Sequence, residues 1–306
     1  MLNKSSLDIF LLEDELTINE GKSGLPQIKI DNKYGSALIS IYGAQLLSYK
    51  TKMNQENELL FVSESAYFEE GKAIKGGIPI CWPWFGRDPE NLGRQMHGFA
   101  RNMLWQIEET ESINDEGTKV VLSLSESDES YKLWPHDFKV ILTINVGKTL
   151  RLSLQTVNTG NKAFSITQAL HAYFGVEDIG QTQVAGLDGV KYIDTVNGAN
   201  KSEMQEGSIS VNQEIDRIYT DVPNRTVLID QKSKREVVID SSGSKTTVVW
   251  NPWIAISKSS GDLNDDAYKR FICIETANAA EDVVVIEPSD SFTIEAEYKV
   301  NVYSVL

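Results

Sequence analysis

Residues 138–157 read FKVILTINVGKTLRLSLQTV, and this stretch decides the fold class. Apolar and polar residues alternate through 138–146 and again through 149–157, which is the period expected of half-buried strands. Residues 146–149 place a glycine between the two runs, as a β-hairpin turn would. The GKT triplet is not a phosphate-binding loop, because residue 142, where such a loop has its first glycine, is leucine. The stretch therefore predicts two antiparallel strands that lie side by side.

The same alternation recurs along most of the chain in short runs rich in β-branched residues. Gly, Asn, Asp and Ser separate these runs, as expected of turns. So many strands with short connections favour an all-β fold, a large antiparallel β-sandwich. The further runs are QIKI (27–30), SALISIY (36–42), KVVLSLS (119–125), FSITQAL (164–170), RTVLI (225–229), REVVI (235–239), KTTVVW (245–250), FICIE (271–275), VVVIE (283–287) and FTIEAEYKV (292–300).

Helical patterning is slight. Residues 7–16 could form one short amphipathic helix, and residues 126–133 could form another. The chain shows no fixed-period repeat, no low-complexity segment and no linker rich in Pro, Gly or Ser. We therefore expect residues 1–306 to form a single domain.

Composition limits the possible partners and the compartment. The net charge of −15 argues against a nucleic-acid partner, since binding a phosphate backbone requires extended basic surface. The first residues carry only a four-residue apolar run, IFLL, which is too short for a secretory signal or a membrane span. Cys81 and Cys273 lie inside apolar segments, as reduced core thiols would. We expect a monomeric cytoplasmic protein with no membrane partner.

Residues 74–101, IKGGIPICWPWFGRDPENLGRQMHGFAR, interrupt the strand pattern with glycines, prolines and aromatic residues. Between residues 72 and 101 five basic residues stand against two acidic ones, a local excess of positive charge in an acidic chain. The segment could be a solvated surface patch. It could also bind a small anion, because glycines let backbone N–H groups approach a phosphate while Lys and Arg supply charge. Long irregular segments in a β-scaffold are usually where function lies.

Candidate acid–base groups are few. The histidines are His97, His136 and His171, and each could be either a hydrogen-bonded structural residue or a catalytic one. They do not have the helical i, i+4 spacing of a common metal site, so we expect no metal. Glu275 ends the apolar run FICIE. It is either a strand-end residue that reaches solvent or a desolvated general base with a raised pKa.

Two further motifs allow a structural or a functional interpretation. The turn WNPW (250–253) offers Trp250 and the amide of Asn251, which would suit a sugar, although a plain structural turn could use the same residues. The run from Asp262 to Asp266 resembles the start of a calcium loop. It lacks the glycine at the sixth position and the glutamate at the twelfth, so we interpret it as a solvated loop.

Seven motifs together carry a family resemblance: GGIPICWPWFGR, HGFARNMLW, LWPHDF, LHAYF, DRIY, WNPW and FICIETA. Their order resembles that in the glucose-6-phosphate 1-epimerases, or hexose-6-phosphate mutarotases, which belong with the aldose 1-epimerase-like proteins. The resemblance spans about residues 28–298. It implies a galactose mutarotase-like supersandwich with a site on the concave face of one sheet. It also implies interconversion of the α and β anomers of an aldohexose 6-phosphate, without metal or organic cofactor.

The resemblance implies catalytic roles for two residues. The family's acid falls on His171 and its base on Glu275, while its sugar-hydroxyl-binding aspartate falls on Asp216. In such a reaction the base takes the proton of the C1 hydroxyl and the acid protonates the ring oxygen. The ring opens, the C1–C2 bond rotates, and the roles reverse on closure. A carboxyl and an imidazole with separated proton affinities suffice for this chemistry.

The resemblance also implies a phosphate end of the site. The family's phosphate-side arginine falls on Arg101, and His97 lines the site. Lys75 stands where the family usually has an arginine before the double glycine. Lysine keeps the charge but loses the two-pronged geometry, so Arg87 or Arg94 could share the phosphate contact.

Two alternatives stay open. The chain could be a non-catalytic carbohydrate-binding β-sandwich, or an epimerase that acts on unphosphorylated aldoses. The presence of both His171 and Glu275 favours an enzyme, and the basic cluster in residues 75–101 favours a hexose 6-phosphate as its small-molecule partner.

Overall fold

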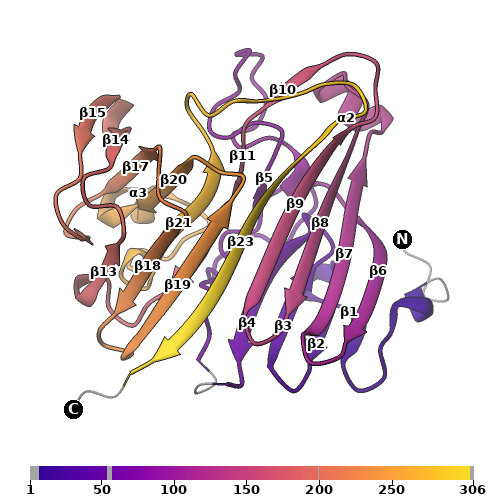
Figure 1. Cartoon of the computed structure of the whole chain (residues 1–306), viewed down its shortest axis with the longest axis horizontal. Helices are drawn as coiled ribbons and strands as arrows, with labels where there is room; N and C mark the ends of the chain where they lie inside the picture. Colours follow the sequence, from indigo (N-terminus) through magenta and orange to yellow (C-terminus); the bar gives the residue numbers. More distant parts are fainter. Residues whose placement is uncertain (1–6, 54–56, 199, 304–306) are drawn as a thin grey trace.

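The computed structural model describes residues 7–53, 57–198 and 200–303. These residues form a largely β structure in which every pair of neighbouring strands within a sheet is antiparallel, which confirms the predicted all-β class (Figure 1). Two large sheets, of nine and eight strands, make up most of the structure together with a four-stranded sheet.

The nine-stranded sheet contains the hairpin predicted from residues 138–157. Val146 pairs with Leu150 across the turn, and Leu142 pairs with Leu154 at its middle. The leucine pair is fully buried, so the apolar face of the hairpin belongs to the core. In spatial order the strands are β16 (Ile209–Ser210), β13 (Thr182–Ala185), β18 (Arg225–Asp230), β19 (Arg235–Ser242), β23 (Ser291–Val302), β9 (Leu150–Asn158), β8 (Phe138–Val146), β7 (Gly117–Ser125) and β6 (Gln106–Ile113).

The eight-stranded sheet has a central strand that is buried on both faces, β21 (Phe271–Asn278). Ile272 and Ile274 belong to the main core cluster, whereas Cys273 and Glu275 alternate with them and point to the opposite face. The other strands are β15 (Lys201–Met204), β14 (Lys191–Asp194), β17 (Ile215–Thr220), β20 (Thr246–Asn251), β11 (Gln168–Leu170), β5 (Ile80–Cys81) and β12 (Tyr173–Gly175), the last of which pairs with β21.

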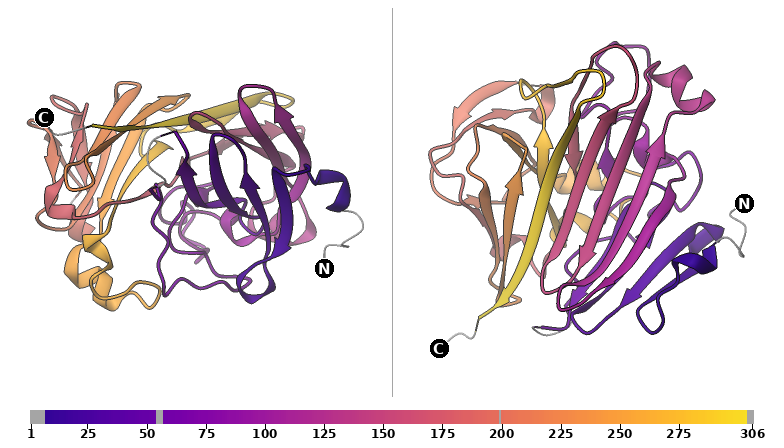
Figure 2. Two further views of the ribbon diagram at one scale, coloured as in Figure 1. Left: turned by 90° about the horizontal axis from the view of Figure 1, so that it is seen from below. Right: turned by 45° about the vertical axis from the view of Figure 1, so that its right-hand side comes forward.

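The four-stranded sheet lies beside the β6–β9 half of the nine-stranded sheet, away from β14 and β15 (Figure 2). Its Ile28 and Ile39 share one hydrophobic cluster with Leu142 of β8, because both sheets turn their apolar faces inward. The strands are β1 (Leu16–Glu20), β2 (Pro26–Asp31), β3 (Gly35–Ser40) and β4 (Gln45–Thr51); a separate pair is β10 (Phe164–Ile166) and β22 (Val284–Ile286).

The two helix predictions have different outcomes. The helix α2 (Asp128–Leu133) confirms the one expected within residues 126–133, and Ser127 caps it by accepting a hydrogen bond from the Ser130 amide. The predicted helix over residues 7–16 is wrong, because β1 already begins at Leu16 and buries it, while Ile9 is left 79% exposed with no surface to pack on. The other helical segments are α3 (Trp253–Ser259) and the 3₁₀ turns η1 (Asp8–Phe10), η2 (Lys22–Gly24), η3 (Ala100–Asn102), η4 (Ile179–Gln181), η5 (Val196–Gly198) and η6 (Ala267–Lys269).

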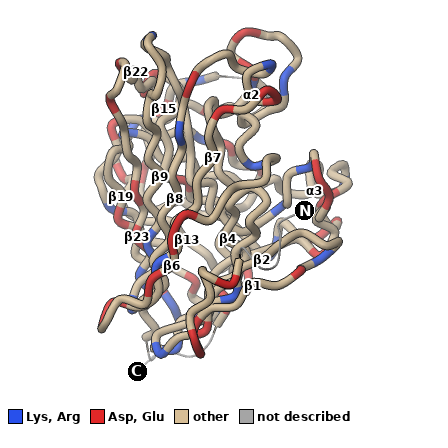
Figure 3. Tube along the Cα trace, turned by 90° about the vertical axis from the view of Figure 1, so that its right-hand side faces the viewer, with Lys and Arg blue, Asp and Glu red and all other residues tan. Residues whose placement is uncertain are grey.

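Two observations bear on possible partners. None of the helices in the described ranges is long and apolar enough to cross a bilayer. Basic residues are interspersed with acidic ones along the chain trace and form no single band (Figure 3). The absence of a nucleic-acid partner stays a prediction.

Candidate active site

The register of the eight-stranded sheet places a row of functional side chains on the face opposite the core. Asp216 pairs with Trp250, Trp250 with Cys273, and Cys273 with Tyr173. Paired residues point to the same face, and so do residues two apart in one strand, so Glu275 lies next to this row. The row crosses four strands that are far apart in the sequence.

His171 meets Glu275 at this row. It lies in the short link between β11 and β12, where its amide donates to the Pro79 carbonyl over 3.1 Å. His171 Nε2 is 3.2 Å from Glu275 Oε1, and both residues are buried, at 6% and 1% exposure. His171 Nδ1 and Glu275 Oε2 have no hydrogen-bond partner within the described structure. Two buried polar atoms are therefore left for a ligand to satisfy.

Burial sets the proton affinities of this pair. It raises the pKa of Glu275 well above 4.5, with a further rise from the nearby Asp216 charge and an opposing effect of Arg101. Burial also lowers the pKa of His171 well below 6.5, and the neighbouring His97 and cationic side chains lower it further. Desolvation disfavours the charged form of each group. Both shifts favour the uncharged pair, a protonated carboxyl beside a neutral imidazole.

His97 lies against this pair as a neutral hydrogen-bond donor. Its ring centre is 5.6 Å from that of His171. Its amide donates to the Gly86 carbonyl over 2.7 Å, and its Nδ1 accepts from the Gly86 amide over 3.2 Å. Burial lowers the pKa of His97 to about 3, and Arg101 and Lys75 lower it as well. Since Nδ1 accepts, the ring proton is on Nε2.

Two of the basic residues reach this region, and they differ in their partners. The Lys75 ammonium is 3.5 Å from Asp262 Oδ2 and 6.0 Å from the centre of the Trp250 ring. Arg101 Nη2 donates to the Met96 carbonyl over 2.8 Å, and its Nε is buried without a partner. No carboxylate in the described structure forms an ion pair with Arg101. Arg101 therefore brings an unpaired positive charge to the site.

The remaining basic residues of the segment are paired with acidic residues or exposed. Arg94 donates its Nε to Asp88 over 3.0 Å and stacks on Trp84 at 4.4 Å. Lys72 forms an exposed ion pair with a neighbouring glutamate, and Arg87 is exposed. The pairing of Arg94 lowers the pKa of Asp88 and closes the surrounding turn, so Arg94 has no free charge to share with a phosphate.

Three glycines of the segment, Gly76, Gly77 and Gly98, allow close backbone packing. Gly76 has φ 117°, and a Cβ there would lie 2.4 Å from the Phe61 carbonyl oxygen. Gly98 has φ 70°, and a Cβ there would lie 1.9 Å from the Trp82 carbonyl oxygen. The Gly77 amide donates to the Phe61 carbonyl over 2.7 Å. Close packing therefore explains Gly76 and Gly98, while an anion contact of the glycine amides other than that of Gly77 stays a prediction.

Asn251 does not reach the site, contrary to the prediction that it contacts a sugar. It is fully buried, and its amide nitrogen donates to the Tyr268 and Phe271 carbonyls over 2.9 and 2.8 Å. Its side-chain oxygen accepts from the Trp253 amide over 3.0 Å. Asn251 thus holds the turn after β20, and the neighbouring Trp250 is left partly exposed beside the pair.

His136 and Asp216 occupy different surroundings. His136 packs on Trp134 and Phe164, with ring centres 4.3 and 5.4 Å away, and takes no part in the row described above. Asp216 is half-buried, and burial raises its pKa while a hydrogen bond from Thr195 opposes that rise. Its charge acts on Glu275, so Asp216 belongs to the site, whereas His136 is a partly exposed residue packed on aromatic side chains.

One group of side chains in the described structure has metal-binding geometry. The ligand atoms of His171, Cys273 and Glu275 all lie within 4.8 Å of one another. Burial raises the pKa of the Cys273 thiol well above 9, so a metal ion would have to displace its proton before the sulfur could bind. A metal ion there would occupy the same imidazole and carboxylate that face each other in the acid–base pair.

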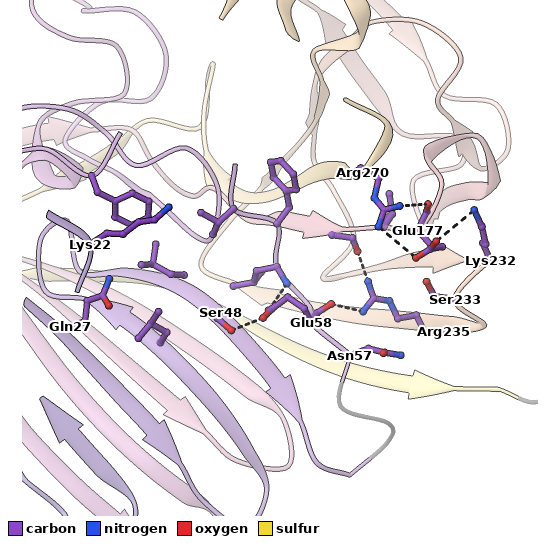
Figure 4. Close-up of a pocket in the computed structure, with 18 residues that line it drawn as sticks. Lys22, Gln27, Ser48, Asn57, Glu58, Glu177, Lys232, Ser233, Arg235 and Arg270 are labelled. Atoms are coloured by element: carbon purple, nitrogen blue, oxygen red, sulfur yellow. Dashed lines mark hydrogen bonds and ion pairs between the residues drawn. The ribbon is translucent and has the colours of Figure 1, made fainter. Parts of the chain in front are cut away.

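A separate cavity of about 1000 Å³ is lined by other residues (Figure 4). Several of its charged residues are paired: Glu177 pairs with Lys232 and Arg270, each over 3.6 Å. Arg235 donates to two backbone carbonyls of the cavity wall. Within the described structure, no buried imidazole–carboxyl pair like that of His171 and Glu275 lines this cavity.

Comparisons with known proteins bear on the family and the fold of the chain. The family model described as aldose 1-epimerase matches residues 26–299. Proteins from Escherichia coli K12 and Cenchrus ciliaris, both named "Putative glucose-6-phosphate 1-epimerase", are 38% and 36% identical to the chain. Each alignment covers 84% of the chain, and it covers 84% and 78% of the relatives.

Solved structures show the same architecture. A structure from Salmonella typhimurium, titled "putative mutarotase", superposes with a TM-score of 0.88 at 32% identity, covering 96% of both chains. A galactose mutarotase-like protein from Clostridium acetobutylicum has a TM-score of 0.73 at 16% identity, covering 95% of this chain and all of its own. The galactose mutarotase-like fold predicted from the motifs is confirmed.

Proposed function

The chain belongs to the aldose 1-epimerase family, and we propose that it interconverts the α and β anomers of a hexose 6-phosphate. The observation that carries this proposal is the buried His171–Glu275 pair with two unsatisfied polar atoms. Relatives named as glucose-6-phosphate 1-epimerases match most of the chain. The protein is accordingly an isomerase rather than a passive sugar-binding domain.

The proposed mechanism conserves the number of protons on the pair. Glu275 as carboxylate takes the proton of the C1 hydroxyl, and His171 as imidazolium gives its proton to the ring oxygen. The bond between C1 and the ring oxygen breaks and a C1 carbonyl forms, which leaves a protonated glutamate and a neutral imidazole. After rotation about C1–C2 the same two transfers run backwards and close the ring to the other anomer.

The surroundings act differently on the two protonation states of the pair. Burial favours the uncharged state, with the proton on Glu275, whereas Arg101 stabilises the Glu275 carboxylate. Because burial also disfavours the imidazolium of His171, the resting pair keeps its proton on Glu275. The 3.2 Å contact between His171 and Glu275 lets the resting pair move its proton without an external donor.

The other site residues are assigned to binding. Asp216 accepts a hydrogen bond from a sugar hydroxyl, Trp250 contacts the apolar face of the ring, and His97 donates from Nε2. Lys75 and Arg101 hold the phosphate. These assignments are supported by the shared row on the sheet and by the cations beside the pair.

Anomer equilibration of two sugars tests this function. Freshly dissolved α-glucose 6-phosphate and α-glucose are followed by polarimetry or NMR exchange, and each rate is divided by its uncatalysed rate. We expect the larger acceleration for the phosphorylated sugar. Equal acceleration would favour an epimerase of unphosphorylated aldoses, and no acceleration of either sugar would favour the non-catalytic alternative.

We further propose that the protein acts in the cytoplasm as a monomer. Cys81 and Cys273 are free and buried, which suits a reducing compartment.

A further inference from the structure

The partner of Lys75 is Asp262, a residue that the sequence analysis assigned to a solvated loop. Asp262 lies in the connection between α3 and η6, and its Oδ2 is 3.5 Å from the Lys75 ammonium. The two side chains are only 22% and 24% exposed. An ion pair with this degree of burial is screened less by salt than one on the open surface.

The Asp262 backbone is held on its C-terminal side. Leu263 is buried in a cluster with Tyr173, Phe271 and Cys273. Asn264 contacts Ser65 through its side-chain oxygen, and its amide nitrogen donates to Glu64 over 3.4 Å. The carboxylate therefore has a fixed position, whereas the ammonium of Lys75 lies at the end of a flexible four-carbon chain.

Arg101 provides the contrast. Both cations act on the pKa values of His97 and His171, so both lie near the acid–base pair. Within the described residues, Lys75 has a carboxylate partner and Arg101 has none. An arriving phosphate meets a free guanidinium but must compete with Asp262 for the ammonium.

We propose that Asp262 determines how strongly the site prefers phosphorylated over unphosphorylated sugars. Its carboxylate holds Lys75 while no phosphate is bound, and the phosphate then replaces it as the partner of the ammonium. A phosphate near neutral pH carries more negative charge than one carboxylate, so the exchange favours the phosphate. The displaced Asp262 carboxylate still opposes the bound anion. This inference rests on the proposed function for the identity of the sugar, but not for the anion.

Removing the competing charge should tighten anion binding. In Asp262→Asn the dissociation constant of inorganic phosphate should fall about two- to fivefold, the size expected for one partly exposed ion pair. The Michaelis constant for glucose 6-phosphate should fall by a similar factor, and the rate with glucose should not change. Asp265→Asn is the matched control, because Asp265 is exposed in the same loop and the change removes the same charge.

The decisive measurement is calorimetric titration with inorganic phosphate, which needs no turnover. Tighter binding in Asp262→Asn but not in Asp265→Asn supports the proposal. Equal effects of the two variants, or weaker binding in Asp262→Asn, would overturn it; the latter would mean that Asp262 orients Lys75 for the phosphate.

A second variant tests whether the effect of Asp262 on phosphate binding acts through Lys75. In a Lys75→Met background the Asp262→Asn change should no longer tighten phosphate binding, because the competed cation is gone. A persisting effect would contradict the exchange. If glucose 6-phosphate shows no catalysed equilibration while the calorimetric results hold, the proposed function fails and the anion exchange stands.

Discussion

The strands β8 and β21 both have alternating sequences, but they differ in how many of their residues are buried. In β8 every second residue is buried and the others are partly exposed, so the strand has one core face. In β21 all residues are buried, because the main core covers one face and two smaller clusters, which include Cys273 and Ala277, bury the other. A polar residue on either face must be hydrogen-bonded or await a ligand.

Some polar residues of β21 are hydrogen-bonded within the protein, and one is left with an unpaired atom. Thr276 contacts Ser241 over 2.8 Å, and Asn278 accepts from Gln168 over 3.0 Å. Glu275 keeps one oxygen without a partner. The comparison teaches that β8 is built for stability, whereas β21 gives up some stability at Glu275 for chemistry.

The largest expected effect is on turnover. Glu275→Gln should lower kcat by about 10²–10⁴-fold, because an amide cannot accept the C1 proton. The folded-state pKa of Glu275 is raised, so the ionisation of this carboxyl in the unfolded chain destabilises the fold as pH rises above about 4.5. Glutamine removes that cost, so the melting temperature should not fall. Retained turnover would move the base elsewhere.

In the β8–β9 hairpin we expect the opposite: a substitution should lower stability and leave kcat unchanged. Leu154→Ala in β9 removes a fully buried side chain and should cost about 2–5 kcal/mol of unfolding free energy. The kcat of the protein that remains folded should be unchanged, since Leu154 faces the core and not the row of Glu275. Urea unfolding and active-site-corrected kinetics measure both quantities. A large loss of kcat here would erase the distinction between the two strands.

The cations should affect binding and not chemistry. Arg101→Ala and Lys75→Ala should each raise the Michaelis constant for glucose 6-phosphate, about tenfold or more for the unpaired Arg101 and less for Lys75, whose charge Asp262 already offsets. Steady-state kinetics with glucose as the second substrate provide the control. A similar loss with glucose would place these residues in the acid–base step.

The smallest effect concerns pH. Since the pKa of His171 is lowered, the pair takes up a second proton only below 6.5, and the acid limb of kcat/KM should lie below that value. The phosphate of the substrate itself titrates near pH 6, so the profile is measured with glucose as well. An acid limb at or above 6.5 with both sugars would contradict the lowered pKa.

Local pattern predicted some elements well and others not. The runs 138–146 and 271–275 became strands because alternation and β-branched residues describe a pleated surface with little help from distant residues. The helix predicted over residues 7–16 does not form, because Leu16 belongs to β1. There it pairs with Ile30 of β2, a residue that the local pattern does not include. The α3 helix was not predicted at all, and its seven residues are too short to show a period.

The residues of the candidate site were likewise predictable only in part. Residue types alone left His171 and Glu275 with two interpretations each, and the order of seven motifs supplied the choice. Asn251 misled, because an amide looks the same in sequence whether it faces a ligand or three backbone groups. Asp262 was passed over, because its role depends on a lysine nearly two hundred residues away in the chain.

The sequence by itself determined the all-β class, the main hairpin and the family, because these depend on short-range alternation and on the order of motifs. Only the tertiary structure decided which polar groups are buried, which cation stays unpaired and which carboxylate faces which imidazole. Proton affinity and charge depend on solvent exclusion and on distances between atoms. Solvent exclusion and these distances arise only when strands that are far apart in the chain pair with one another.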